Sequence, residues 1–431
     1  MDSRLLTIQS RRDVARTELD SAVRRVLVVL CGSRGGSSLF KEALARHPRI
    51  ASLDGELDPL LALSGNGFNQ NSDSDSIETV ANVPELVSSI LDEISFPSAQ
   101  ILDTGPLLRK WKNRLALQFP SHFLDAGAYR RLDESLQVAL SQIDRGDRRS
   151  EADLQRLILS RIFIDEPWRI GYYDGNATPR VGHHFDESLK IEEPPFVMPT
   201  LRRRLFASSD ARDSVLLFKS PSDAYRIGMY ERLFPHAEVT YVHLTRGFAQ
   251  SVNGLMDGWL YPLGFFSHDL SKVGCELGIR GYSDRVSFGR KWWKFDLPRN
   301  WRNFTRATLE DVCLNQWYSI HEAILQRGVC TLRVSFEDFV ADPASVLKRV
   351  TDHLGLPAIA LPGALPVKMA TDPPQPRRWR KRGPLLMELS RRPEVRDIAL
   401  AAAPVCAVLV LGVAGSLRRA CRPRSQKERF G

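Results

Sequence analysis

The sequence predicts an α/β fold in which a central, mainly parallel sheet lies between layers of helices. Residues 26–31 are an apolar run that leads through a Gly/Ser loop into a helical pattern. Residues 215–218 and 238–245 are two further β-rich runs, and each is followed by a basic residue and another helical pattern. Strands that alternate with helices form parallel sheets, so the carboxyl ends of these three strands should share one edge.

The loop after the first strand has the composition of a phosphate-binding turn. It consists of Ser33, Arg34, Gly35, Gly36, Ser37 and Ser38. Glycines let the backbone approach an anion closely, and the first amides of the following helix carry partial positive charge. The loop lacks the final Lys-Ser/Thr of GxxxxGK[ST], which reaches the β- and γ-phosphates and holds Mg²⁺. An ordinary Mg²⁺-dependent triphosphatase is therefore disfavoured, and a plain glycine turn stays open as the alternative.

Beyond the loop, three more segments complete a pattern that resembles the PAPS-dependent sulfotransferases, whose donor is 3′-phosphoadenosine 5′-phosphosulfate. Residues 33–39 resemble the family's 5′-phosphosulfate loop, and residues 244–246, ending in Arg246, are similar to its 3′-phosphate site. Residues 334–343 and 353–357 resemble later landmarks, in the family's order. The resemblance implies a three-layer P-loop-like fold, PAPS as co-substrate and no metal.

Two positions depart from the family's pattern or match it less closely. The family usually has a serine eight residues after the 3′-site arginine, where this chain has Gly254. Ser251 or Asn253 could take over that phosphate contact, and Ser251 is favoured because it lies only about 60° around the helix from the expected direction. The family's later basic segment has a counterpart in residues 377–383, which makes Arg380 a candidate donor ligand. A solvated basic surface is the alternative there.

Sulfuryl transfer needs positive charge around the oxygen that leaves with the bisphosphate, because negative charge accumulates there during in-line attack on sulfur. We expect Arg34 and Lys219 to supply it, since both follow strand ends and match basic positions that the family places around the sulfuryl group. By analogy with phosphoryl transfer, positioning and electrostatics should dominate the catalysis. A surface lysine at a strand terminus is the alternative for Lys219.

The transfer also needs a base near the acceptor, and Glu56 is the first candidate. The Gly-Glu at this position resembles the catalytic glutamate of tyrosylprotein-type sulfotransferases, whereas a helix-capping or salt-bridged glutamate is the alternative. The aryl-type enzymes use a histidine two residues after the strand-end lysine, where this chain has Pro221. His183 and His184 are the fallback. The expected acceptor is a hydroxyl, or less favourably an amine, of a small molecule or peptide.

Length and composition indicate one catalytic domain with additions. The chain has 431 residues, of which 43% are hydrophobic, enough for a large core. We predict an N-terminal extension at 1–22 and a sulfotransferase domain at 23–390. A largely helical insertion at about 65–210 should cover the acceptor side, and residues 391–431 should form an apolar helix with a basic tail.

The net charge and the composition of the terminal segments indicate which partners and which cellular location to expect. The net charge of +9 is spread along the chain without a recognition motif, so nucleic acid is disfavoured and a polyanionic donor fits the same field. The first residues lack an apolar signal core, which favours the cytoplasm. Residues 398–417 carry no charged side chain and are flanked by arginines, so membrane contact stays open beside a packed helix. The oligomeric state is not predicted.

Two other function classes fit parts of the pattern. A P-loop kinase of small molecules shares the topology, but it would need a Mg²⁺ site and a lysine in the loop. A non-catalytic module could keep the nucleotide and use the insertion and the C-terminal segment to bind a partner. The presence of Arg34, Lys219 and Glu56 argues against that module.

Overall fold

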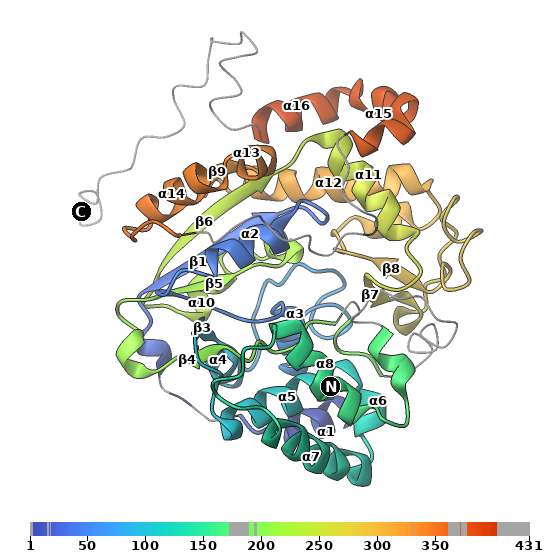
Figure 1. Ribbon diagram of the computed structural model, residues 1–431. Helices are drawn as coiled ribbons and strands as arrows, with labels where there is room; N and C mark the ends of the chain where they lie inside the picture. Colours follow the sequence, from blue (N-terminus) through green and yellow to red (C-terminus); the bar gives the residue numbers. More distant parts are fainter. Residues whose placement is uncertain are drawn as a thin grey trace.

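The described part of the chain forms a three-layer α/β fold, which confirms the predicted fold class (Figure 1). This computed structural model describes residues 3–14, 17, 19–171, 189–193, 196–329, 331–360, 371 and 377–402. A seven-stranded sheet lies at the centre, and a separate two-stranded hairpin lies beside it.

The sheet has the strand order β4-β3-β2-β5-β1-β6-β9. Its parallel strands are β2 (Ile50–Ser52), β5 (Val215–Phe218), β1 (Arg25–Cys31), β6 (Glu238–Thr245) and β9 (Thr331–Ser335). The short strands β3 (Ser95–Pro97) and β4 (Arg203–Leu205) pair antiparallel at one edge. The three strands predicted from the sequence, β5, β1 and β6, are direct neighbours, so their carboxyl ends do share one edge.

From Val26 onward, strand β1 is apolar without interruption because helices cover both of its faces. Leu27 and Val29 belong to the core on one side, which contains Phe40 of α2 (Ser37–Leu44). Helices α13 (Phe336–Ala341) and α14 (Pro343–His353) complete that side. Val26 and Val28 belong to the core on the other side. That core is completed by residues of α10 (Met229–Leu233), α12 (Leu309–Gln326), α3 (Asp58–Leu63) and α4 (Val83–Glu93).

The region predicted as an insertion contains a group of helices that lies apart from the sheet. This group consists of α5 (Thr104–Gln118), α6 (Pro120–Phe123), α7 (Ala126–Ser141) and α8 (Glu151–Ile162). Figure 1 shows these helices together below the sheet. They have their own core, which includes Trp111, Leu136 and Ile158. The region also supplies β3 and β4, so it is hydrogen-bonded into the sheet at both of its ends.

Both ends of the described chain pack against the domain. Helix α1 (Ser3–Arg11) buries Leu5 and Ile8 in the main core. Near the other end, α15 (Gly383–Ser390) and α16 (Pro393–Ala402) lie against α11 (Phe248–Trp259) and α12 (Figure 1). Of the segment 398–417, residues 403–417 lie outside the described residues. In the part that is described, no helix has the length and apolarity to cross a bilayer.

Candidate active site

Most of the predicted site residues meet at the carboxyl edge of the sheet, where they border one cavity of about 1710 Å³. Arg34 follows β1, Lys219 follows β5 and Arg246 follows β6. The predicted residues on the cavity wall are Ser33, Arg34, Gly36, Ser37, Ser38, Glu56, Lys219 and Arg246. This is the place where open α/β sheets bind their ligands.

The loop between β1 and α2 has the tight backbone of an anion-binding turn. Arg34 and Gly36 have φ angles of 64° and 85°. A Cβ atom on Gly36 would lie 2.2 Å from the ring of Phe336, and one on Gly35 would lie 2.7 Å from the carbonyl oxygen of Gly32. Gly36 is the N-cap of α2, and no side chain caps its first amides. Those amides therefore offer donors to an anion in the cavity.

The three serine hydroxyls of the loop already have partners in the fold. Ser33 Oγ donates to Asp296 Oδ1 at 2.6 Å. Ser37 is hydrogen-bonded to the thiol of Cys31, and Ser38 Oγ accepts from Lys219 Nζ at 3.3 Å. The loop therefore presents mainly backbone amides to a ligand.

Lys219 and Glu56 form an ion pair in the cavity wall. The Lys219 side chain is 5% exposed and that of Glu56 is 41% exposed. Burial lowers the pKa of Lys219, but the charge of Glu56 and other neighbours raises it by more, so its pKa is higher than usual. Lys219 is thus a buried, fully charged cation beside the loop.

Lys41 holds the turn that carries Glu56. Its ammonium donates to the carbonyl oxygens of Leu53, Asp54 and Gly55, the three residues that precede Glu56. Burial is the main reason that the pKa of Lys41 falls to about 8. The position of Glu56 is therefore set by the helix that begins at the loop.

Arg246 is a partly buried guanidinium with donor capacity to spare. Its Nη1 donates to the carbonyl oxygen of Arg34 at 2.7 Å, and its guanidinium carbon lies 5.1 Å from the centre of the Phe336 ring. Its Nε atom is buried without a hydrogen-bond partner, and it forms no ion pair with a carboxylate in the described ranges. Burial lowers its pKa. An anion beside Arg246 would satisfy these donors.

The structure gives a physical reason for glycine at position 254. A Cβ atom there would lie 3.2 Å from Cβ of Arg34, so helix α11 approaches the loop too closely for an easy fit of serine. Ser251 is buried, donates to the carbonyl oxygen of Arg246 at 3.4 Å and does not border the cavity. Asn253 does border it, with its Oδ1 accepting from Arg382 at 2.6 Å.

Of the other predicted residues, Arg380 is not brought to the cavity. Arg380 is exposed and lies outside the wall, whereas its neighbours Arg377 and Arg378 line it. Arg378 reaches Asp257 Oδ2 at 2.5 Å. His183 and His184 lie outside the described residues.

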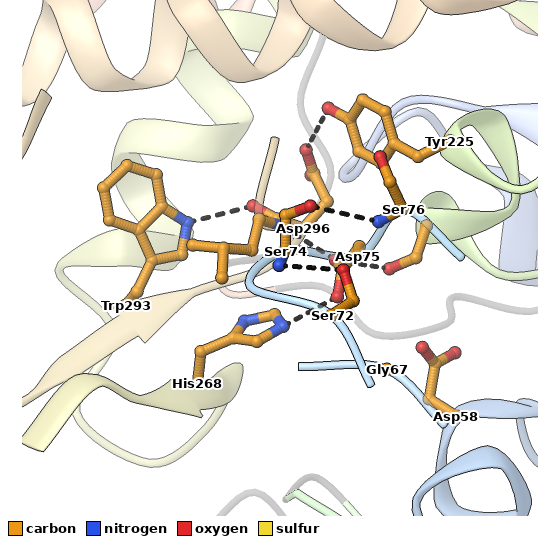
Figure 2. A network of polar contacts seen from close by, with 12 residues as sticks. Asp58, Gly67, Ser72, Ser74, Asp75, Ser76, Tyr225, His268, Trp293 and Asp296 are labelled. Carbon is orange, nitrogen blue, oxygen red and sulfur yellow. Dashed lines mark hydrogen bonds and ion pairs between the residues drawn. The ribbon is translucent and has the colours of Figure 1, made fainter. Parts of the chain in front are cut away.

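The cavity wall also holds four ionisable residues that sequence reasoning missed, and two of them form a His–Asp pair. His268 lies on β7 (Phe266–Asp269), which pairs with β8 (Trp292–Lys294). Its Nε2 lies 2.8 Å from Asp75 Oδ1, as Figure 2 shows. Burial raises the pKa of Asp75, but His268, Arg226 and the Leu297 amide lower it by more, to about 2.

The other two missed residues are carboxyl groups that border the cavity. Asp296 accepts from Ser33 and, through Oδ2, from the Tyr225 hydroxyl at 2.9 Å, and burial raises its pKa to about 7. Glu193 is hydrogen-bonded to Ser267, and burial raises its pKa to about 8. Its Oε2 atom is buried without a hydrogen-bond partner.

Sequence signals for these four residues are weak. Asp75 lies in a polar Ser/Asp stretch that has the composition of a surface loop, and His268 lies in an aromatic run. In the structure, Ser74, Asp75 and Ser76 are all buried. Among the described residues, no group of three or more His, Cys, Asp or Glu side chains is arranged to hold a metal ion.

Comparisons with known proteins give low similarity throughout. No family model and no curated protein matches the chain. Among solved structures, a sulfotransferase domain from the curacin biosynthetic pathway is 14% identical over 78% of this chain and 75% of its own, with a TM-score of 0.30. A sulfotransferase domain from the Synechococcus PCC 7002 olefin synthase is 15% identical over 80% and 77%, with a TM-score of 0.27. Sulfotransferase STF1 from Mycobacterium tuberculosis H37Rv is 12% identical over 82% and 73%, with a TM-score of 0.30.

Proposed function

We propose that this protein is a sulfotransferase that moves the sulfuryl group of 3′-phosphoadenosine 5′-phosphosulfate to a hydroxyl of a small-molecule or peptide acceptor. One observation carries the proposal: two anion sites border the same cavity at adjacent strand ends. The uncapped amides of α2 follow β1, and Arg246, with its unpartnered Nε, follows β6. A 3′,5′-bisphosphate has two separate phosphates that match two separate sites, whereas the phosphates of ATP are contiguous.

The chemistry is an in-line displacement at sulfur. The acceptor oxygen forms a bond to sulfur while the bond from sulfur to the bridging phosphate oxygen breaks, and the acceptor hydroxyl loses its proton. Lys219 is the best placed cation for the departing oxygen because it is buried, charged and in contact with Ser38 of the loop. Arg34, in the same loop, adds positive charge. Such preorganised charges stabilise the transition state more than the ground state.

Glu56 belongs to this machinery through its ion pair with Lys219. The prediction that Glu56 accepts the proton from the acceptor stays a prediction. The ion pair supports another role, in which Glu56 holds the Lys219 ammonium against the loop until the donor binds. In either role, removal of the carboxylate should lower turnover more than donor affinity.

The donor can be tested without knowledge of the acceptor. Adenosine 3′,5′-bisphosphate should raise the melting temperature of the protein, since stabilisation follows RT ln(1 + [L]/Kd), and ATP with Mg²⁺ should raise it much less. Labelled PAPS should then transfer sulfate to members of a panel of phenols, alcohols, amines and peptides. An equal shift with ATP, with no transfer to any acceptor, would contradict the proposal and favour a kinase or a binding module.

A further inference from the structure

His268 has one ring nitrogen held by the protein and one that is not. The side chain lies in the cavity wall and the residue is 8% exposed. Its Nε2 faces Asp75, and its Nδ1 is buried without a hydrogen-bond partner in the described part of the chain. A buried polar atom without a partner is unfavourable, so a side chain of the cavity wall that carries such an atom suits a ligand that supplies the missing hydrogen bond.

Asp75 fixes which nitrogen carries the proton in the neutral ring. Its Oδ2 accepts from Ser222 Oγ and from the Leu297 amide, each at 2.8 Å. Because Asp75 keeps its charge, it accepts the Nε2 hydrogen, which leaves the lone pair on Nδ1. The ring of Phe68 packs edge-on against the imidazole at 5.3 Å and keeps it in this plane.

The His–Asp pair is tied to both turns that carry the predicted reaction groups. Ser222, which binds Asp75, comes three residues after Lys219. Arg226 donates from Nε to the Asp75 carbonyl oxygen at 3.0 Å and pairs with Asp58, two residues after Glu56, at 2.5 Å. Hydrogen bonds and an ion pair therefore connect the His–Asp pair, which Figure 2 shows, to the turns that carry Lys219 and Glu56, and all four residues border the same cavity or bind its wall.

We propose that His268 is the catalytic base, which takes the proton of the acceptor hydroxyl on Nδ1 while Asp75 orients the ring. This deepens the proposed function and rests on it. As the acceptor oxygen bonds to sulfur and the bridging oxygen leaves with the bisphosphate, the hydroxyl proton moves to Nδ1. Asp75 stabilises the imidazolium that forms, and the proton later passes to water. A nitrogen base oriented by a carboxylate is the arrangement that nucleophile activation requires.

The charges that face His268 favour this role. Burial lowers its pKa, but Asp75, Glu193 and Asp58 raise it by more, so its pKa lies above the usual 6.5. A base is most effective when its pKa is near the working pH. Glu56, in contrast, would have to give up Lys219 before it could take a proton. The expected kcat/KM therefore rises with pH as the imidazole loses its proton.

The test compares His268→Gln with wild type and with His236→Gln, a substitution of an exposed histidine. Glutamine can still donate to Asp75, but it has no basic nitrogen. For a weakly acidic alcohol, kcat/KM of His268→Gln should fall by roughly 10²–10⁴-fold, the usual contribution of a general base. The loss should be smaller for 4-nitrophenol, and the rise of kcat/KM with pH should disappear. The melting shift with adenosine 3′,5′-bisphosphate should stay as in wild type.

A second measurement needs no donor. 4-Nitrophenol bound to wild type should ionise at a lower pH than in water, which is seen in the absorbance of the phenolate, and His268→Gln should abolish that change. The proposal is overturned if His268→Gln keeps the wild-type rate and pH profile, or loses activity equally for all acceptors with the pH profile unchanged. Absence of sulfuryl transfer in wild type would instead overturn the proposed function, whatever the absorbance shows.

Discussion

The two sides of the cavity are built in different ways. The donor side, named for the proposed function, consists of three neighbouring strand ends, and its cations Arg34, Lys219 and Arg246 follow their strands by no more than three positions. The acceptor side combines the segment around Asp75, the residues around Glu193 and the β7–β8 hairpin, which are far apart in the sequence. The positions of the donor-side residues are thus set by the backbone of the sheet, whereas those of the acceptor-side residues are set by tertiary packing. Variants of the two sides should therefore separate donor affinity from acceptor chemistry.

Among variants of the donor side, Lys219→Ala should have the largest effect. Loss of a preorganised charge at the leaving oxygen should lower kcat by about 10²–10³-fold. Affinity for PAPS should change less, because negative charge accumulates on the bridging oxygen only as its bond to sulfur breaks. Single-turnover transfer from PAPS measures the first quantity and calorimetric titration the second. Lys348→Ala, which removes an exposed lysine paired with Asp352, is the matched control. A loss of affinity alone would remove Lys219 from the leaving group.

Arg246→Ala should have the opposite effect, a large loss of donor affinity and a small loss of kcat. A hydrogen bond to a charged group contributes about 1.5–3 kcal/mol, so the Kd of the bisphosphate should rise by roughly 10- to 150-fold. The kcat at saturating PAPS should fall much less, and Arg246→Lys should recover part of the affinity. If Arg246→Ala instead lowers kcat and leaves Kd unchanged, the 3′-phosphate does not bind at β6.

Gly36→Ala tests the backbone of the donor loop. Its φ angle of 85° is unfavourable for alanine by about 1–2 kcal/mol, and the new methyl group would also collide with the Phe336 ring. We expect a lower free energy of unfolding and weaker bisphosphate binding, with the ranking of acceptors unchanged. Adding Phe336→Ala should relieve the collision but leave the φ penalty. A Gly36→Ala protein with wild-type affinity would show that the loop backbone does not touch the donor.

Asp296→Asn should have the smallest effect and lies where the two sides meet, because Asp296 binds Ser33 of the donor loop. Its pKa of about 7 lies above that of an unfolded aspartate, so the folded protein keeps a proton that the unfolded chain releases. This contribution to stability is complete below about pH 4 and declines as pH rises to 7. The variant should therefore lose less stability over that range, as urea denaturation at several pH values would show. An identical pH slope would contradict the raised pKa.

In wild type, the Asp296 carboxylate that forms above pH 7 should also oppose an anionic donor. Bisphosphate affinity should then fall with pH more in wild type than in Asp296→Asn. Asp223 and Glu193 have pKa values of about 7 and about 8, so the variant should keep part of the stability slope. Titration at pH 6 and pH 8.5, roughly one unit or more on either side of the Asp296 value, measures the difference.

The sheet and the donor side could be predicted because local patterns specify them. An apolar run buried on both faces, followed by glycines and a helix, specifies β1, its loop and α2 within one segment. The role of Ser251 could not be read in the same way. Its hydroxyl donates to the Arg246 carbonyl oxygen, and the close approach of α11 to Arg34, which disfavours a serine at position 254, is a distance that no local pattern encodes.

The acceptor side was missed because its residues acquire their environment only in the folded chain. Asp75 has the neighbours of a surface loop in sequence, yet it is buried by the hairpin and by the turn after β5. Likewise, nothing near His268 in sequence indicates a carboxylate partner almost two hundred positions earlier. Local reasoning instead selected the adjacent histidines His183 and His184, because two neighbouring histidines can be seen in the sequence. A histidine that pairs with a distant carboxylate cannot.

The order of the strands has a consequence for synthesis of the protein. Strand β1 ends at Cys31, but the two strands that flank it begin at Val215 and Glu238. At about 5–20 residues per second, the ribosome would leave β1 with both edges open for roughly 10–40 s. During that time an apolar strand is exposed to other nascent chains. The protein should therefore depend on chaperones during translation, and slower translation before residue 215 should lower the yield of soluble protein.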